Sequence, residues 1–424
     1  MIKYREYRTV KSIKELVVTV GAVDGATIGE LCELINADGT VICATVIAAS
    51  DSEVVLRAHG STSGMSIDGT CVRFTGKMPR LAVSENMLGR CFDGLGAPCD
   101  GGPRIISDDR RALYTPPQTP AVKHSPTKPI TTGLTAIDAC ATLLIGQKLA
   151  VLYENGTDVQ GLISLISSRF IRENNDKRDR LVISVCIGGN DSEKHACFQR
   201  LDTLGISDRS ISFASTLQSP LPERLATPYT AMAAAEYFAI ERGMQVLVSL
   251  YDMSAYSAAY RALTDELRLS LPNTPQPTLS AEVSAILERA GVYKSGGSIT
   301  VIAAASVGSS GAGDVVRRAS EGCIALSASL ARRGVFPAID ITRSYSELMV
   351  NVKSTSVRPE KANELVGAYA RLLCSKEDGD IALARMLEQR LIRQADDESR
   401  TAVASAAIVD ELLAACRAES QTNE

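Results

Sequence analysis

The sequence predicts a multidomain α/β protein in three parts: an N-terminal β-barrel, a central parallel-sheet domain and a C-terminal helical bundle. Three observations lead to this prediction. Short β-rich runs separated by turns fill residues 17–74, apolar strands alternate with helical stretches over 77–347, and helical periodicity dominates from Pro359 onward. The 424 residues also exceed what one compact core normally holds.

The first part, residues 1–76, alternates short apolar runs with turn residues. The runs read LVVTV, TVICATVIA, EVVLRA and TCVRF, and the turns contain VDG, SDS and HGSTSG. A turn roughly every ten residues is typical of antiparallel strands. Closure into a small barrel removes the exposed strand edges, so we expect a barrel that ends near Gly76.

The second part, residues 77–347, alternates buried strands with helices. The strands read QKLAVLY, DRLVISVCIGG, ISFAS, QVLVSLYD and SITVIAAA, and the helices are expected near 159–173, 191–204, 228–242 and 254–271. Continuous apolar strands with intervening helices predict a parallel sheet covered on both faces. Ligands of such sheets bind at the carboxyl ends of the strands. The proline-rich stretch PNTPQP at 272–277 predicts an exposed loop.

The third part, residues 348–424, is predicted to be helical. The stretches ELVGAYARLL, DIALARMLEQRLIRQ and VASAAIVDELLAAC carry apolar residues at helical spacing.

Composition excludes several classes of function. The net charge of −4 provides no general basic field for nucleic acid. The eleven cysteines form no CxxC pair and only three histidines are present, so no metal site is expected. Scattered cysteines without a signal peptide favour a reducing cytosol. No apolar run approaches the ~20 residues of a membrane helix, so any membrane association is expected through other subunits.

The segment LAVLYENGTDVQGLISLI (149–166) has the layout of a strand, a phosphate loop and a helix. A working Walker loop reads GxxxxGK[ST], with a lysine for the phosphates and a hydroxyl for magnesium. If Gly156 is the first glycine of a GxGK[ST] ending, Val159 and Gln160 stand at the lysine and magnesium-ligand positions. We therefore predict a degenerate loop that consists of Glu154, Asn155, Gly156, Thr157, Asp158, Val159 and Gln160.

Two carboxylates also oppose phosphate binding there. Glu154 and Asp158 add negative charge to the loop, and like charges a few ångströms apart cost ~1 kcal/mol even in water. The plain alternative is an ordinary strand-to-helix loop without a ligand. The start of the helix still has the means to attract a weak anion.

Asp252 ends an apolar strand, as a Walker B carboxylate does. The alternative is structural, since many strands end in an aspartate that caps the next helix. No other catalytic constellation occurs: the sequence has no GxSxG elbow and its histidines are isolated, so we assign no catalytic residue to this chain.

Several long segments, in one order, resemble the B subunits of the vacuolar and archaeal-type rotary ATPases. They are RLAVSENMLGRCFDGLGAPCDGGP (80–103), ITTGLTAIDACATLLIGQKL (130–149), TPYTAMAAAEYFAIERGMQVLVSLYDMSAY (227–256), ILERAGV (286–292) and FPAIDITRSYSELM (336–349). The last resembles the PxxDxxxSxS signature of the large rotary ATPase subunits, here Pro337, Asp340, Ser344 and Ser346. The likeness runs from EYRTV near the start to about Met349.

This resemblance implies a RecA-like, P-loop-type central domain and a non-catalytic, regulatory role. Three B subunits would alternate with three catalytic A subunits around a central stalk, with peripheral stalk subunits outside. ATP or ADP and magnesium would belong to the A subunit, and the membrane rotor would be an indirect partner. The complex would couple ATP hydrolysis or synthesis to proton or sodium transport at the cytoplasmic face of a membrane.

The chain departs from the family pattern at the interface with the catalytic subunit. The family usually follows SxS with an arginine finger, whereas this sequence has Glu347. Arg343, four residues earlier, either reaches the site from another backbone position or pairs with Glu347 or another carboxylate. The predicted interface residues are therefore Arg343, Ser344, Ser346 and Glu347.

A second departure lies in the stretch LSLPNTPQPTLSAEV (269–283), which replaces the family's arginine- and glycine-rich loop. Two hypotheses remain. One is a working ion-translocating ATPase whose active interface has been rebuilt, and the other is a ring-forming structural paralogue with little or no ATPase activity. A third interpretation, an independent ATPase such as a secretion-system homohexamer, has the same three-part layout.

Overall fold

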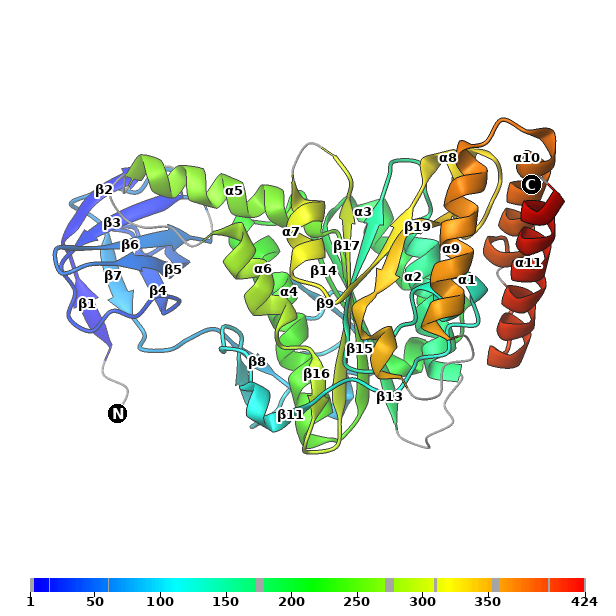
Figure 1. The fold of residues 1–424 in the computed structure, drawn as a ribbon. Coiled ribbons are helices and arrows are strands. Elements are labelled where there is room, and N and C mark those ends of the chain that lie inside the picture. Colours follow the sequence, from blue (N-terminus) through cyan, green and yellow to red (C-terminus); the bar gives the residue numbers. More distant parts are fainter. Residues whose placement is uncertain are drawn as a thin grey trace.

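A computed structural model of the chain describes residues 4–14, 16–59, 61–172, 179–270, 278–308, 311–352, 358–395 and 397–422. Figure 1 shows the predicted multidomain α/β architecture, with the barrel at one end, the parallel sheet in the middle and the last helices at the other end. The expected loop at 272–277 lies outside the described residues. Among the described helices, none has the length and apolar character needed to cross a membrane.

The N-terminal barrel is a seven-stranded antiparallel sheet that curls around its own apolar core. In pairing order its strands are β1 (Arg5–Tyr7), β7 (Cys71–Phe74), β4 (Leu31–Ile35), β5 (Val41–Ala49), β6 (Glu53–Ala58), β3 (Val17–Gly21) and β2 (Val10–Lys14). Side chains alternate between buried and partly exposed along β4 and β7. Val18, Leu34, Leu56 and Phe74 meet inside, none of them exposed to solvent.

The central sheet has ten strands and is mostly parallel. Its path runs β19 (Ile339–Ser346), β18 (Gly322–Leu326), β12 (Lys148–Tyr153), β17 (Ser298–Ser306), β15 (Gln245–Tyr251), β13 (Arg180–Gly189), β14 (Ser210–Thr216) and β9 (Cys91–Asp93), with β16 (Gly291–Tyr293) beside β17 and β11 (Lys123–His124) beside β16. All five predicted strands pair in parallel as expected, whereas β19, β16 and β11 pair antiparallel. A short ribbon of β8 (Arg80–Ala82) and β10 (Arg110–Ala112) lies between the barrel and the sheet.

Helices cover both faces of the central sheet. One face carries α1 (Thr135–Cys140), α2 (Val159–Arg172) and the C-terminal helices, while the other carries α4 (Leu221–Glu236), α5 (Met253–Ser270), α6 (Leu279–Leu287) and α7 (Ala312–Arg318). The expected helices are present, but α4 begins at Leu221 and not near Pro228, which lies inside it. The α5 helix extends to the barrel, where Leu263 packs against Val17 and Val55 (Figure 1).

Shorter helical elements complete the chain. They are α3 (Asp191–Thr203) against β13 and β14, α8 (Ala328–Arg332) after β18, the 3-10 turns Glu85–Met87, Pro120–Val122, Ser207–Arg209 and Glu347–Asn351, and the π-helical turns Tyr237–Glu241 and Glu388–Ile392.

The C-terminal region consists of α9 (Pro359–Cys374), α10 (Asp378–Leu387) and α11 (Ala402–Thr422), in line with its predicted periodicity. Its buried side chains belong to the same apolar cluster as those of α1, α2 and β19. The buried Gln394 side chain adds polar bonds, since its Nε2 donates to the Gly133 carbonyl at 2.9 Å and its Oε1 accepts from the Thr135 amide at 2.7 Å. These helices therefore form a covering layer of the sheet.

Candidate functional site

The structure keeps the strand, loop and helix layout that the sequence predicts for a phosphate loop. The β12 strand ends at Tyr153 and α2 begins at Val159, so residues 154–158 form the loop at the carboxyl edge of the sheet. Gly156 has a φ of 91°, a backbone conformation that favours glycine. The strand, loop and helix layout is thus retained, and the side chains of the loop differ from those of a working Walker loop.

Neither of the two positions at which a working loop carries its lysine and its hydroxyl is freely exposed. Val159, at the lysine position, is 4% exposed and belongs to the apolar cluster between α2 and the sheet. Gln160 is half-buried on the first turn of α2. A lysine at position 159 would therefore start inside the hydrophobic core, away from any phosphate at the loop.

Asp158 occupies the anion position at the start of α2. Its Oδ1 accepts from the Gly161 amide at 2.8 Å, which makes it the cap of this helix. Arg200 on α3 forms an ion pair with the same carboxylate at 3.2 Å. Because a helix N-terminus attracts one local negative charge, the chain already supplies the anion that a phosphate would provide.

Glu154 is held in a different direction. Its Oε2 accepts from the Ala328 amide at the start of α8 at 2.9 Å, and its Oε1 accepts from Arg343 Nη1 at 3.1 Å. The two loop carboxylates thus have separate cationic partners, which reduces the mutual repulsion expected from the sequence. Arg343 pairs with Glu154, which is one of the two outcomes that the sequence left open.

The remaining loop residues face solvent or the backbone. Asn155 is exposed, and the Thr157 hydroxyl donates to the Glu154 carbonyl at 2.8 Å. No group of three or more His, Cys, Asp or Glu side chains in the described ranges has the arrangement of a metal site.

Asp252 lies at the end of β15, two strands away from β12 in the sheet. Its Oδ1 accepts from the Ser254 amide at 2.8 Å and so caps α5. Burial raises the pKa of Asp252, while the hydrogen bonds from Ser254 and the Tyr153 hydroxyl oppose that rise. The arrangement agrees with the capping alternative for this carboxylate.

Tyr153 is a residue that the sequence did not single out. Its ring lies 6.1 Å from that of Tyr251, centroid to centroid, across the carboxyl edge of the intervening strand β17. The two tyrosines therefore lie near each other at the carboxyl edge of the sheet, at the last positions of β12 and β15. No spacing rule predicts this contact, because the two rings belong to strands nearly a hundred residues apart in sequence.

The predicted interface residues divide into two pairs. Ser344 is buried, and its hydroxyl accepts from the Ala325 amide at 3.0 Å and donates to the Asp340 carbonyl at 2.7 Å. The Ser346 hydroxyl accepts from Gln147 Nε2 at 2.9 Å. These serines hold β19 to its neighbours, whereas Arg343 and Glu347 are exposed.

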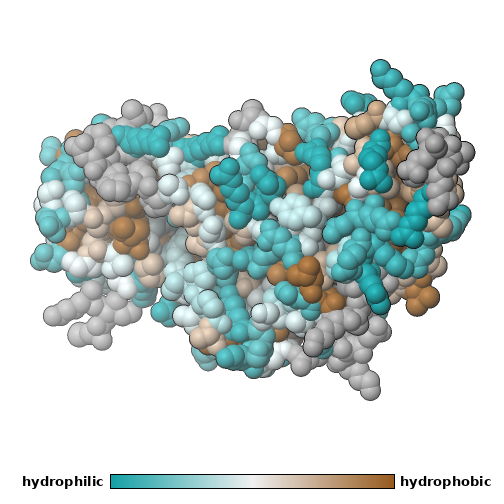
Figure 2. Space-filling view, viewed as in Figure 1, coloured by the Kyte–Doolittle hydropathy of each residue, from teal (hydrophilic) through white to brown (hydrophobic). Residues whose placement is uncertain are grey.

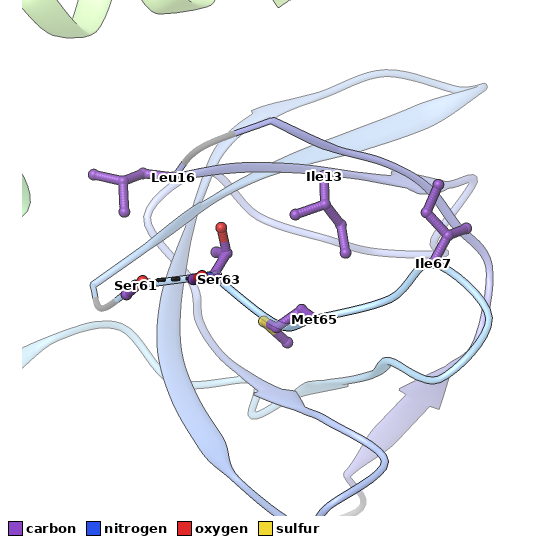
Figure 3. A pocket seen from close by; sticks show the side chains of 7 residues that line it. Ile13, Leu16, Ser61, Ser63, Met65 and Ile67 are labelled. Atoms are coloured by element: carbon purple, nitrogen blue, oxygen red, sulfur yellow. Dashed lines mark hydrogen bonds between the residues drawn. The ribbon is translucent and has the colours of Figure 1, made fainter.

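A hollow at the end of the barrel is unsuited to a phosphate. Its volume is about 590 Å³, and its described lining consists of Ile13, Leu16, Ser61, Thr62, Ser63, Met65 and Ile67. Figure 3 shows the Ile13, Met65 and Ile67 side chains around it. None of these lining residues is ionisable, so they provide no charge to attract an anion.

The fold and the loop together define a protein with a β-barrel and a mostly parallel-sheet domain, in which the carboxylate of Asp158 caps the helix after β12. The sequence model of the ATP synthase alpha/beta family, nucleotide-binding domain, matches residues 133–346, and the model of the family's beta-barrel domain matches residues 10–76. The chain belongs to the ATP synthase alpha/beta family, whose members are subunits of rotary ATPases.

Proposed function

We propose that this chain is the non-catalytic, B-type chain of a V-type or A-type rotary ATPase. In this proposal it alternates with catalytic A subunits in a hexameric ring that couples ATP hydrolysis or synthesis to proton or sodium transport. The A subunit binds ATP or ADP and magnesium, and this chain binds no cofactor tightly. The stalk subunits connect the ring to the membrane rotor, which places the chain at the cytoplasmic face of the membrane.

The observation that carries the proposal is the filled phosphate position. Asp158 caps α2 and pairs with Arg200, while Val159 lies in the core where a catalytic loop needs a lysine. A triphosphate would have to displace a tethered carboxylate without a lysine to compensate its charge. This favours a subunit that contributes a correctly shaped interface to the ring rather than catalytic groups.

The first experiment measures the purified full chain alone. We expect no ATP hydrolysis above background and no micromolar ATP binding by calorimetry, because Val159 and Gln160 replace the essential groups. Turnover by the isolated chain that disappears in the Asp252→Ala variant would instead support an independent ATPase, and it would refute the proposal.

A second candidate, a ring-forming structural paralogue, is favoured by the state of the interface. Glu347 is exposed where the family's arginine finger is expected, and Arg343 is engaged by Glu154. A complex with this interface alone would lack a transition-state cation. The sequence of the cognate A subunit separates the candidates: an intact GxxxxGK[ST] loop together with a new arginine facing Glu347 favours the working ATPase.

Co-expression with the cognate A subunit, mass determination and an ATPase assay test both candidates. Arginine fingers contribute about 10³–10⁵ in rate, so we expect Glu347→Arg to raise the rate of the complex by at least about tenfold. Glu347→Gln is the matched control, because it removes the negative charge without adding a cation. Unchanged or lower rates with arginine would show that the active interface does not use this position.

A further inference from the structure

A pocket of about 500 Å³ lies on the opposite face of the central sheet from α2. Leu152 and Cys323 in its lining belong to the apolar cluster beneath α4, α5 and α7, which fixes the face on which it opens. Residues of β19 and α7 form its sides. This pocket is therefore distinct from the degenerate phosphate loop, although both lie near the end of β12.

Two arginines reach this pocket from different elements. Arg317 comes from α7 and Arg343 from β19, and both line the cavity. Their charges also act on one buried group: burial raises the pKa of the Cys323 thiol to about 11, and Arg317 and Arg343 both oppose that rise. The two arginines thus border the same cavity.

The described lining of the pocket carries an excess of positive charge. Two arginines and one carboxylate line it: Asp314, whose side chain is 68% exposed, lies 3.4 Å from Arg317, while Arg343 is paired with Glu154, which lies outside the lining. Hydrogen bonds to the Tyr345 hydroxyl and then to Asp314 raise the pKa of Arg317. Arg343 uses Nη1 for Glu154, and a guanidinium has five N–H donors in all.

We propose that this pocket binds the phosphate groups of a polyphosphate-bearing ligand between Arg317 and Arg343. A guanidinium fork matches the oxygen spacing of a phosphate, and two forks from opposite sides can hold one anionic tail. Both arginines are partly exposed to solvent, so the affinity should be millimolar rather than micromolar. The site belongs to the isolated chain, so it stands or fails independently of any role in a rotary complex.

Glu154 limits this site, because its carboxylate holds Arg343 toward the phosphate loop. A ligand in the pocket and Glu154 compete for the same guanidinium. Removing the charge of Glu154 should therefore strengthen anion binding, an effect opposite in sign to that of removing either arginine.

The test titrates the full chain with inorganic phosphate, tripolyphosphate and ATP at low ionic strength, with binding followed by NMR chemical shifts. Loss of one charged hydrogen-bond partner should weaken tripolyphosphate binding about tenfold in Arg317→Gln and in Arg343→Gln. Glu154→Gln should bind more tightly than the wild type. Arg209→Gln is the matched control, since Arg209 is a half-exposed arginine paired with Asp179 and is not part of the pocket lining.

The three ligands distinguish the sources of the phosphate. Equal affinity for tripolyphosphate and ATP assigns the site to the polyphosphate tail alone, tighter binding of ATP adds contacts to the nucleoside, and inorganic phosphate sets the contribution of a single group. Circular dichroism of each variant confirms that it is folded.

Three outcomes would overturn the proposal. The first is no saturable binding to the wild type, and the second is equal weakening in Arg209→Gln, which would indicate diffuse surface attraction. The third is wild-type affinity in both pocket variants together with tighter binding in Asp158→Asn, which would place the anion at the start of α2.

Discussion

At the scale of single residues, the loop carboxylates show what the sequence could and could not predict. The absence of lysine and hydroxyl at positions 159 and 160 is visible in the sequence and predicts a loop without phosphate chemistry. The partners of the carboxylates are not visible, because Arg200 lies 42 positions from Asp158 and Arg343 lies 189 positions from Glu154. The sequence predicts repulsion, and the fold supplies a counter-charge to each carboxylate.

Asp252 allows a prediction at the same scale. Asparagine keeps an acceptor for the Ser254 amide and removes a half-buried charge, whereas alanine loses the cap. We expect Asp252→Asn to be at least as stable as the wild type near neutral pH, and Asp252→Ala to be less stable than Asp252→Asn by about 1 kcal/mol. Denaturant unfolding of the three proteins measures this.

The pH dependence follows from the raised pKa of Asp252. A carboxyl whose folded pKa lies above its unfolded value contributes stability that is complete below the unfolded pKa and is lost as pH rises through the folded pKa. The wild type should therefore gain stability relative to Asp252→Asn on acidification through that range. If Asp252→Asn loses as much stability as Asp252→Ala at neutral pH, the carboxylate has a role beyond capping.

At the scale of elements, length and burial decide which predictions succeed. Strands such as β13 and β17 are long, mostly apolar and buried along almost their whole length, and the sequence locates them because a buried parallel strand needs no alternation. Strands such as β1, β9 and β11 have two or three residues and carry no periodic signal. Each of them pairs with a strand that is distant in the sequence, so local pattern does not reveal it.

Proline explains the one helix whose start was misplaced. The α4 helix begins at Leu221 with Pro222 in its first turn, where proline is tolerated, and continues through Pro228. Proline inside a helix removes one hydrogen bond, so the sequence places the boundary there. Burial of the flanking residues Thr227 and Tyr229 accounts for the continuation, because tertiary packing outweighs the local preference.

The start of α2 gives a prediction at this scale. We expect Val159→Lys to destabilise the fold by about 3 kcal/mol without creating nucleotide binding, because the new ammonium group would begin in the apolar core. Gln160→Lys, one position further along the half-buried first turn, is the matched control and should change stability little. Unfolding free energies and ATP calorimetry are the measurements, and ATP binding by Val159→Lys at wild-type stability would contradict the burial argument.

At the scale of the whole molecule, the sheet and the last helices share one core. The sequence predicts a separate helical part because glycine and proline become rare after Pro359. Helical periodicity shows which side of a helix is buried, but it does not identify the element that the helix packs against. The structure places Leu365, Leu387 and Leu412 in the cluster that also contains Ile339 of β19. The change in composition after Pro359 therefore does not mark the start of a separate hydrophobic core.

This shared core predicts coupled unfolding. Leu412 is 1% exposed on α11, and Leu412→Ala should cost about 2–5 kcal/mol. Hydrogen exchange should then show lower protection in α1 and β19 as well as in α9 and α11. Val403→Ala, at a position 79% exposed on the same helix, is the control and should leave both regions protected. Loss of protection confined to the last helices would indicate an independent domain.

The carboxylate of Asp158 has a consequence for how this edge of the sheet responds to its surroundings. A dissolved anion occupies a helix start in proportion to its concentration, whereas a group attached by its own backbone cannot diffuse away. We therefore expect the first turn of α2 to keep the Asp158 cap whether or not ATP is present in solution.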